Sequence, residues 1–144
     1  MKWICPFFLV FLLLFASCRR LSVDRRYTNE TSLASNFVKS PDRLKHHPPK
    51  GEKLWVSWNL PSQYLRVHDQ LILTLRVVKK NLEEEVVTYP VTHRIGRVVY
   101  SCMNEEFTES GGILTYKAEI STIDGQVIKI IKQAMWFTPI HVSD

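Results

Sequence analysis

Residues 54–61 read Leu54-Trp55-Val56-Ser57-Trp58-Asn59-Leu60-Pro61, with apolar side chains at every second position until a proline closes the run. This alternation is typical of a β-strand that buries one face, because successive side chains of a strand point to opposite sides. The two tryptophans fall on opposite faces by the same rule. We therefore predict a strand here, with one tryptophan directed away from the core.

The same kind of pattern continues toward the C-terminus. Five further runs alternate or are rich in Val, Ile and Tyr, and they cover residues 71–78, 83–92, 97–102, 114–121 and 126–138. Six such runs with short turns and no convincing amphipathic helix predict a single all-β domain, an antiparallel sandwich or barrel, over residues 52–144. Asp124-Gly125 predicts a type I′ hairpin, because that turn needs positive φ at both central residues.

Two stretches resemble fibronectin type III and related immunoglobulin-like sandwiches. Residues 54–61 are similar to the second strand of that family, in which a tryptophan fills the core and a proline follows. Residues 114–120 are similar to its sixth strand, in which a tyrosine precedes alternating apolar residues. The resemblance implies that Trp58 and Tyr116 are core residues of a binding or spacer domain, and it names no ligand.

The N-terminus has the parts of an export signal. A positive start at Lys2 precedes an apolar run over residues 3–16, and small residues follow. Fourteen residues of helix span about 21 Å, which is short of the roughly 30 Å hydrocarbon core of a bilayer. We therefore predict a signal peptide over residues 1–17 rather than a transmembrane helix.

The end of this leader resembles the bacterial lipobox, an apolar residue and two small residues before a cysteine. Cys18 matches the lipidated position, Ala16 and Ser17 match the small ones, and Phe15 departs from the leucine that the family prefers. The resemblance implies that lipid on Cys18 anchors the mature chain to a membrane of the bacterial cell envelope. Arg19 stands where some families carry an acidic inner-membrane signal, so the sequence favours the outer membrane over the inner.

Two alternatives to a lipid anchor stay open. The chain is a plain secreted protein if Cys18 remains unmodified at the junction. It is an uncleaved signal anchor if Arg19 and Arg20, directly after the apolar run, resist translocation.

Residues 18–51 have few large apolar side chains and end in a Pro-Pro-Lys-Gly sequence, which predicts an irregular linker that could reach roughly 100 Å if extended. Residues 19–53 hold nine Lys or Arg and four Asp or Glu, whereas residues 54–144 hold nine basic and ten acidic residues. The nearly neutral body argues against a nucleic-acid partner, and the basic linker suits anionic lipid headgroups. The glycosylation sequon at Asn29 is interpreted as coincidence behind a lipobox.

Catalytic and cofactor motifs are missing from the sequence. Ser101-Cys102 has no nucleophile-elbow frame, and the histidines lack ligand-type neighbours, so no metal or cofactor is predicted. We expect a non-enzymatic structural or protein-interaction role. Three aromatic residues are candidates for the partner surface, because exposed aromatic patches tend to bind: Trp55, Trp136 and Phe137.

The competing hypothesis is a secreted domain that binds a small ligand or acts as an enzyme. It requires a concave polar pocket at one end of the sandwich, lined by His68, His93 or Cys102. Cys102 is otherwise expected to behave as a small buried hydrophobe, because it has no intramolecular disulfide partner once Cys18 is acylated.

Overall fold

A computed structural model describes residues 21–33, 38, 41, 43–68 and 70–138. Cys18 and the leader over residues 1–17 lie outside these residues, so the predicted signal peptide and lipid site are not described. Within the described part of the chain, no helix is both long and apolar enough to cross a bilayer.

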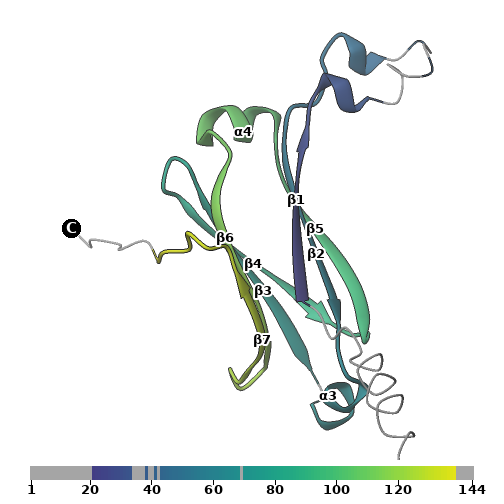
Figure 1. The fold of residues 1–144 in the computed structure, drawn as a ribbon, viewed down its shortest axis with the longest axis vertical. Helices are drawn as coiled ribbons and strands as arrows, with labels where there is room; N and C mark the ends of the chain where they lie inside the picture. The colour runs from purple at the N-terminus through teal and green to yellow at the C-terminus, as the bar shows by residue number, and fades with distance from the viewer. Residues whose placement is uncertain (1–20, 34–37, 39–40, 42, 69, 139–144) are drawn as a thin grey trace, which may run out of the picture.

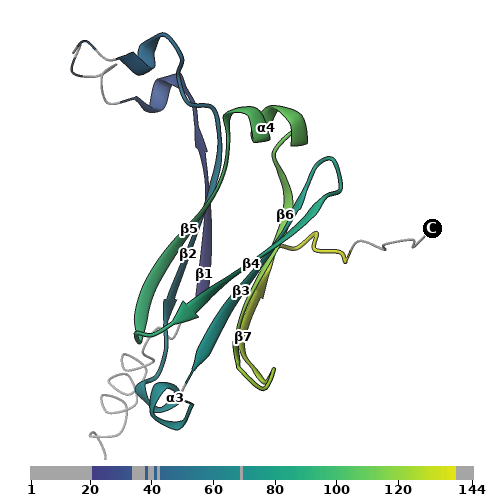
Figure 2. The same ribbon diagram turned by 180° about the vertical axis from the view of Figure 1, so that it is seen from behind.

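The described residues form two antiparallel sheets that face each other (Figures 1 and 2). The smaller sheet has the order β1-β2-β5, from strands Leu21–Thr28, Gly51–Asn59 and Ile95–Met103. The larger has the order β4-β3-β6-β7, from strands Glu84–Val91, Leu71–Lys79, Ile113–Thr122 and Val127–Lys132. The prediction of an all-β antiparallel sandwich is confirmed.

The core lies between the two sheets and follows the period-two pattern. Over residues 52–59 of β2 and 71–77 of β3, every second residue points inward and is buried, while its neighbours are partly exposed. Trp58 is buried among the core residues, and Tyr116 packs against the core while partly exposed. The other fully buried apolar side chains include Leu54, Val56, Leu60, Leu73, Leu75, Val77, Ala118 and Ile120.

The structure differs from the expected irregular linker over Leu21–Thr28, which forms strand β1. This strand pairs with β2 along its whole length, from Leu21 opposite Trp58 to Thr28 opposite Gly51. Its alternation is hard to recognise because Arg25 occupies an inward position that an apolar residue would normally fill. The strands of the sandwich therefore begin at Leu21 rather than at residue 52.

Short helices connect some of the strands. Helix α3 (Ser62–Val67) links β2 to β3, and α4 (Asn104–Ser110) links β5 to β6. Single turns of 3-10 helix, η1 (Glu30–Ser32) and η2 (Arg43–Lys45), lie between β1 and β2. The sequence predicted no helix because segments this short show no complete amphipathic period.

The last hairpin forms where Asp124-Gly125 predicted it, with a different turn. Gly125 has φ 88°, but Asp124 is not among the described non-glycine residues with positive φ. Gly125 N donates to Thr122 O at 3.0 Å, and Thr122 N donates to Gln126 O at 2.9 Å. This is the three-residue hairpin with a type I turn and a glycine bulge. The strand after it ends at Lys132, well before Thr138.

Candidate functional site

The candidate site is the outer face of the three-stranded sheet around Trp55. Trp55 lies in the middle of the central strand β2 and points away from the core that holds Trp58. Its cross-strand neighbours are Asp24 on β1 and Val99 on β5. An aromatic side chain at the centre of a partly exposed sheet face offers a large rigid contact area to a partner.

Two arginines flank the indole from the neighbouring strands. The guanidinium carbon of Arg26 lies 5.4 Å from the Trp55 ring centroid, and that of Arg97 lies 5.3 Å from it. By register they are diagonal neighbours of Trp55, since Arg26 pairs with Lys53 and Arg97 pairs with Ser57. Both contacts are within the range of a cation–π interaction, and the two side chains hold the ring between them.

Hydrogen bonds fix both arginines while leaving most of their donors exposed. Arg26 Nε donates to Asp24 Oδ2 at 2.7 Å, and Arg97 Nε donates to Ser57 Oγ at 3.1 Å. Lys53 adds a third positive charge to this face, against the single negative charge of Asp24. We call this surface the Trp55 face and define it as Arg26, Lys53, Trp55, Arg97 and Val99.

Trp136 and Phe137, the other predicted surface aromatics, lie elsewhere. They follow β7, which belongs to the larger sheet. The Trp136 ring lies under Lys117 Nζ at 5.9 Å, and Lys117 is on the outer side of β6 opposite Arg76. Phe137 is 41% exposed. The structure therefore does not join these residues to Trp55 in one surface.

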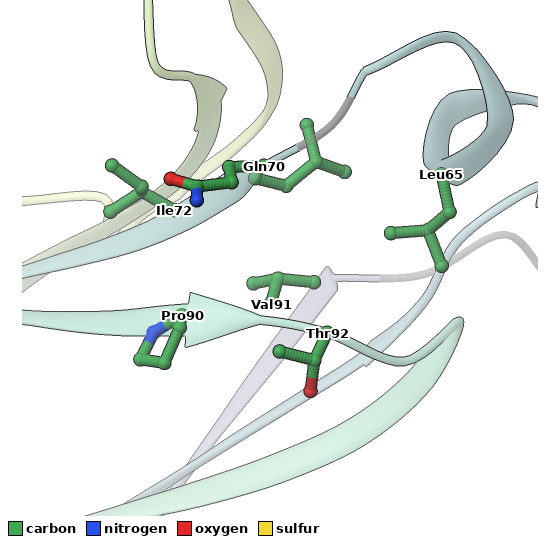
Figure 3. Close-up of a pocket in the computed structure, with 7 residues that line it drawn as sticks. Leu65, Gln70, Ile72, Pro90, Val91 and Thr92 are labelled. Carbon is green, nitrogen blue, oxygen red and sulfur yellow. The ribbon is translucent and has the colours of Figure 1, made fainter.

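Figure 3 shows a concavity between α3 and the neighbouring ends of β3 and β4. Its lining is apolar except for an amide and a hydroxyl, and consists of Leu65, Gln70, Leu71, Ile72, Pro90, Val91 and Thr92. The Thr92 hydroxyl in this lining lies 2.8 Å from Nδ1 of His93, the next residue along the chain, and the lining residues include no carboxylate, amine or thiol.

The residues named for the ligand or enzyme hypothesis are not brought together. His68 lines an open concavity with Asp124. His93 is exposed in the turn before β5, where its carbonyl accepts a hydrogen bond from Trp58 Nε1 at 3.0 Å. Cys102 is fully buried toward the other end of β5. The described residues contain no group of three potential metal ligands.

A charged network at the α4 end of the sandwich joins β3, β4 and α4. Lys79 Nζ lies 2.7 Å from Glu106 Oε1 and 3.1 Å from Glu85 Oε2, which also accepts a hydrogen bond from Tyr100 at 2.7 Å. The hydrogen bond to Glu106 raises the pKa of Lys79 despite burial, and burial raises the pKa of the Cys102 thiol. Both groups therefore stay protonated at neutral pH, which suits a structural network better than a nucleophile.

A second buried ion pair joins β1 to the core. Both carboxylate oxygens of Glu52 lie 2.8 Å from Arg25 Nη2, and Glu52 Oε2 also accepts the Ile113 N–H at 2.9 Å. Arg25 donates in addition to the Ile113 carbonyl at 2.6 Å. Burial raises the pKa of Glu52, but the hydrogen bonds from Arg25 and Ile113 outweigh it and hold the pKa below its ordinary value.

This depressed pKa predicts a loss of stability in acid. Because the folded-state pKa lies below the unfolded one, the contribution of Glu52 is complete above the unfolded value and disappears as pH falls through the folded value. We expect the free energy of unfolding to decrease below about pH 4.3, the ordinary glutamate pKa. Urea titrations at several pH values would measure this, and a Glu52→Gln chain should show a shallower decrease. If the free energy of unfolding decreased equally with pH in the native and the Glu52→Gln chains, Glu52 would not be the group responsible.

Comparison with protein-family models, with curated proteins and with solved structures found no match to this chain.

Proposed function

We propose that this chain is a lipoprotein of the bacterial cell envelope, anchored by lipid on Cys18, whose sandwich binds a protein partner and catalyses no reaction. The observation that carries the binding role is the partly exposed Trp55, flanked by Arg26 and Arg97 on the outer side of the small sheet. The anchor is supported by the lipobox-like sequence before Cys18.

A fibronectin type III-like or immunoglobulin-like relationship is part of this proposal. With β1 included, Trp58 lies on the second strand and Tyr116 on the sixth, the places that the resemblance implies. In immunoglobulin sandwiches, strands A, B and E share one sheet and strands C, F and G share the other. Here the first, second and fifth strands share one sheet, and the third, sixth and seventh share the other. Domains of this architecture serve many unrelated functions, so the binding role rests on the Trp55 face and not on the fold.

The charges of the Trp55 face define the chemistry of the partner. Arg26, Lys53 and Arg97 surround the ring, and Asp24 is the single acidic neighbour by register. A carboxylate of the partner could approach the free guanidinium donors, while an apolar side chain packs on Trp55 and Val99. We therefore propose an acidic protein segment with at least one apolar anchor.

The anchor is tested by the mass of the mature protein. We expect detergent-extracted material to begin at Cys18, without residues 1–17, and to carry the added mass of three acyl chains. A Cys18→Ser chain should then leave the membrane fraction. An unmodified residue 18, or a retained leader, would exclude a lipid anchor.

The partner surface is tested with a photo-reactive amino acid in place of Val99, next to Trp55 on the sheet. We expect a discrete protein adduct in intact cells that disappears in a Trp55→Ala chain and weakens in an Arg97→Glu chain. Thr88 is the matched control position, because it is exposed on the outer side of β4 in the other sheet.

A Trp136→Ala chain is the matched control substitution, since this aromatic residue lies on the other sheet. It should leave the adduct intact. An adduct that survives Trp55→Ala, or one that forms equally from position 88, would show that the Trp55 face is not the binding surface.

A further inference from the structure

The start of β1 fixes which end of the sandwich is nearest to the proposed anchor. Two residues, Arg19 and Arg20, separate Cys18 from Leu21 in the sequence. Because an extended chain advances at most about 3.6 Å per residue, Leu21 can lie no further than roughly 11 Å from the anchored cysteine. A 30-residue linker would allow the sandwich to take any orientation relative to the membrane. A connection of only three residue-to-residue steps, from Cys18 to Leu21, restricts that orientation.

Several connections share this end of the molecule with Leu21. Leu21 pairs with Trp58 at the end of β2, and Ile95 at the start of β5 pairs with Asn59. Leu71 at the start of β3 pairs with Thr122, so the β6–β7 hairpin and helix α3 also lie at this end. Figures 1 and 2 show α3 and this hairpin together at the lower end, opposite α4.

Exposed aliphatic side chains project from three of these connections. Val67 at the end of α3 is 74% exposed, Ile123 in the β6–β7 hairpin is 65% exposed, and Ile95 at the start of β5 is 59% exposed. Val67 and Ile123 also line one open concavity together. Branched apolar side chains at loop tips gain by leaving water, and the hydrocarbon boundary of a bilayer accepts them.

The charges at this end suit an anionic membrane. Arg66 and Arg94 are exposed beside Val67 and Ile95, Asp124 is the acidic residue described at this end, and Asp69 follows α3 in the sequence. Arg19 and Arg20 precede β1 in the sequence. Basic side chains next to apolar tips are the combination that binds lipid phosphates while the apolar groups enter the interface.

We propose that this end of the sandwich is a membrane-docking surface, on which Val67, Ile95 and Ile123 enter the interface of a bilayer that contains anionic lipid. The proposal rests on the membrane anchor of the proposed function, and adds that the folded body contacts lipid directly. In this orientation the strands extend away from the bilayer surface. The Trp55 face then lies on the side of the domain, where a partner can reach it.

The experiment places a single cysteine with an environment-sensitive fluorophore at position 95 or 123 of the full chain. The labelled protein is reconstituted into vesicles of phosphatidylethanolamine and phosphatidylglycerol that contain spin-labelled lipid as a quencher. Leu82 is the matched control, because it is 61% exposed in the β3–β4 turn at the opposite end of β3. The chain without an added cysteine gives the background from the native cysteines, of which Cys102 is buried.

We expect strong quenching by lipid at positions 95 and 123 and none at position 82. Ile123→Asp together with Val67→Asp should remove the quenching at position 95, whereas Leu82→Asp should not. Solvent-like fluorescence at 95 and 123 in protein that remains bound to the vesicles would overturn the docking surface and leave the anchor standing. A Cys18→Ser chain that stays equally vesicle-bound would instead overturn the lipid anchor while lipid quenching still reports the docking.

Discussion

Replacement of Glu52 by alanine is expected to lower the free energy of unfolding by about 3–5 kcal/mol, the usual cost of removing one partner from a buried ion pair. Glu52 is fully buried and accepts hydrogen bonds from Arg25 and from the Ile113 N–H. Alanine would leave a largely buried guanidinium without its counter-charge and a buried backbone donor without its acceptor. Strand β1 should detach first, because Arg25 is one of its three inward side chains, with Leu21 and Val23.

Equilibrium denaturation in urea measures this loss of stability. Two further variants test whether the loss comes from the Arg25–Glu52 ion pair. Glu109→Ala is the matched control, because Glu109 is exposed on α4 and should change stability by less than about 0.5 kcal/mol. Arg25→Met combined with Glu52→Met should be less costly than the sum of the two single changes, since the pair is then replaced by apolar side chains. An effect of Glu52→Ala no larger than that of Glu109→Ala would mean that the ion pair does not support β1.

The strands after residue 52 could be predicted because each shows its own burial pattern. An inward residue every second position is a local property of β2 and of most of β3 and β6, and the sequence displays it directly. The phase changes at the start of β6, where Ile113 and Thr115 are buried and Leu114 is 37% exposed, beside the register shift in β3. The pairing of these strands into two sheets depends on contacts between distant residues, and only the antiparallel class could be expected from the short turns.

Strand β1 could not be predicted from its own residues. Leu21 and Val23 point inward, but the next inward side chain is Arg25, which is stabilised by Glu52, 27 positions away in the sequence. A charged residue at an inward position interrupts the alternating apolar pattern, so the segment is interpreted as a polar linker unless the buried partner of that charge is known. In the Lys79 network the same long-range pairing applies to Glu106 on α4, which is 27 positions from Lys79, whereas Glu85 on β4 is six positions away across a hairpin.

The candidate site was predictable in part. Alternation around Trp55 and Trp58 indicated that one tryptophan leaves the core, and the structure identifies it as Trp55. The flanking arginines were not predicted, because Arg26 lay in the supposed linker and Arg97 lies in a strand 42 residues beyond Trp55 along the chain. Trp136 and Phe137 were grouped with Trp55 by exposure alone, which says nothing about the sheet to which they belong.

The second large effect is expected at the contact between Trp58 and Gly96. Trp58 packs in the core, and a Cβ atom built on Gly96 would lie 2.8 Å from the ring atom Cη2 and closer still to Cζ2. Trp58→Ala should therefore cost about 3–5 kcal/mol through the cavity it leaves. Gly96→Ala should cost about 1–3 kcal/mol, because the added methyl forces the indole out of its place.

The double variant makes the contact itself measurable. In a Trp58→Ala chain the space beside Gly96 is empty, so Gly96→Ala should cost little there or restore some stability, which gives a strong coupling in a double-mutant cycle. Trp55→Ala is the matched control, since it removes the same residue type from the outer side of the same strand and should cost less than Trp58→Ala. Additive effects of the two core changes would show that Gly96 does not make room for Trp58, and that another constraint selects glycine at this position.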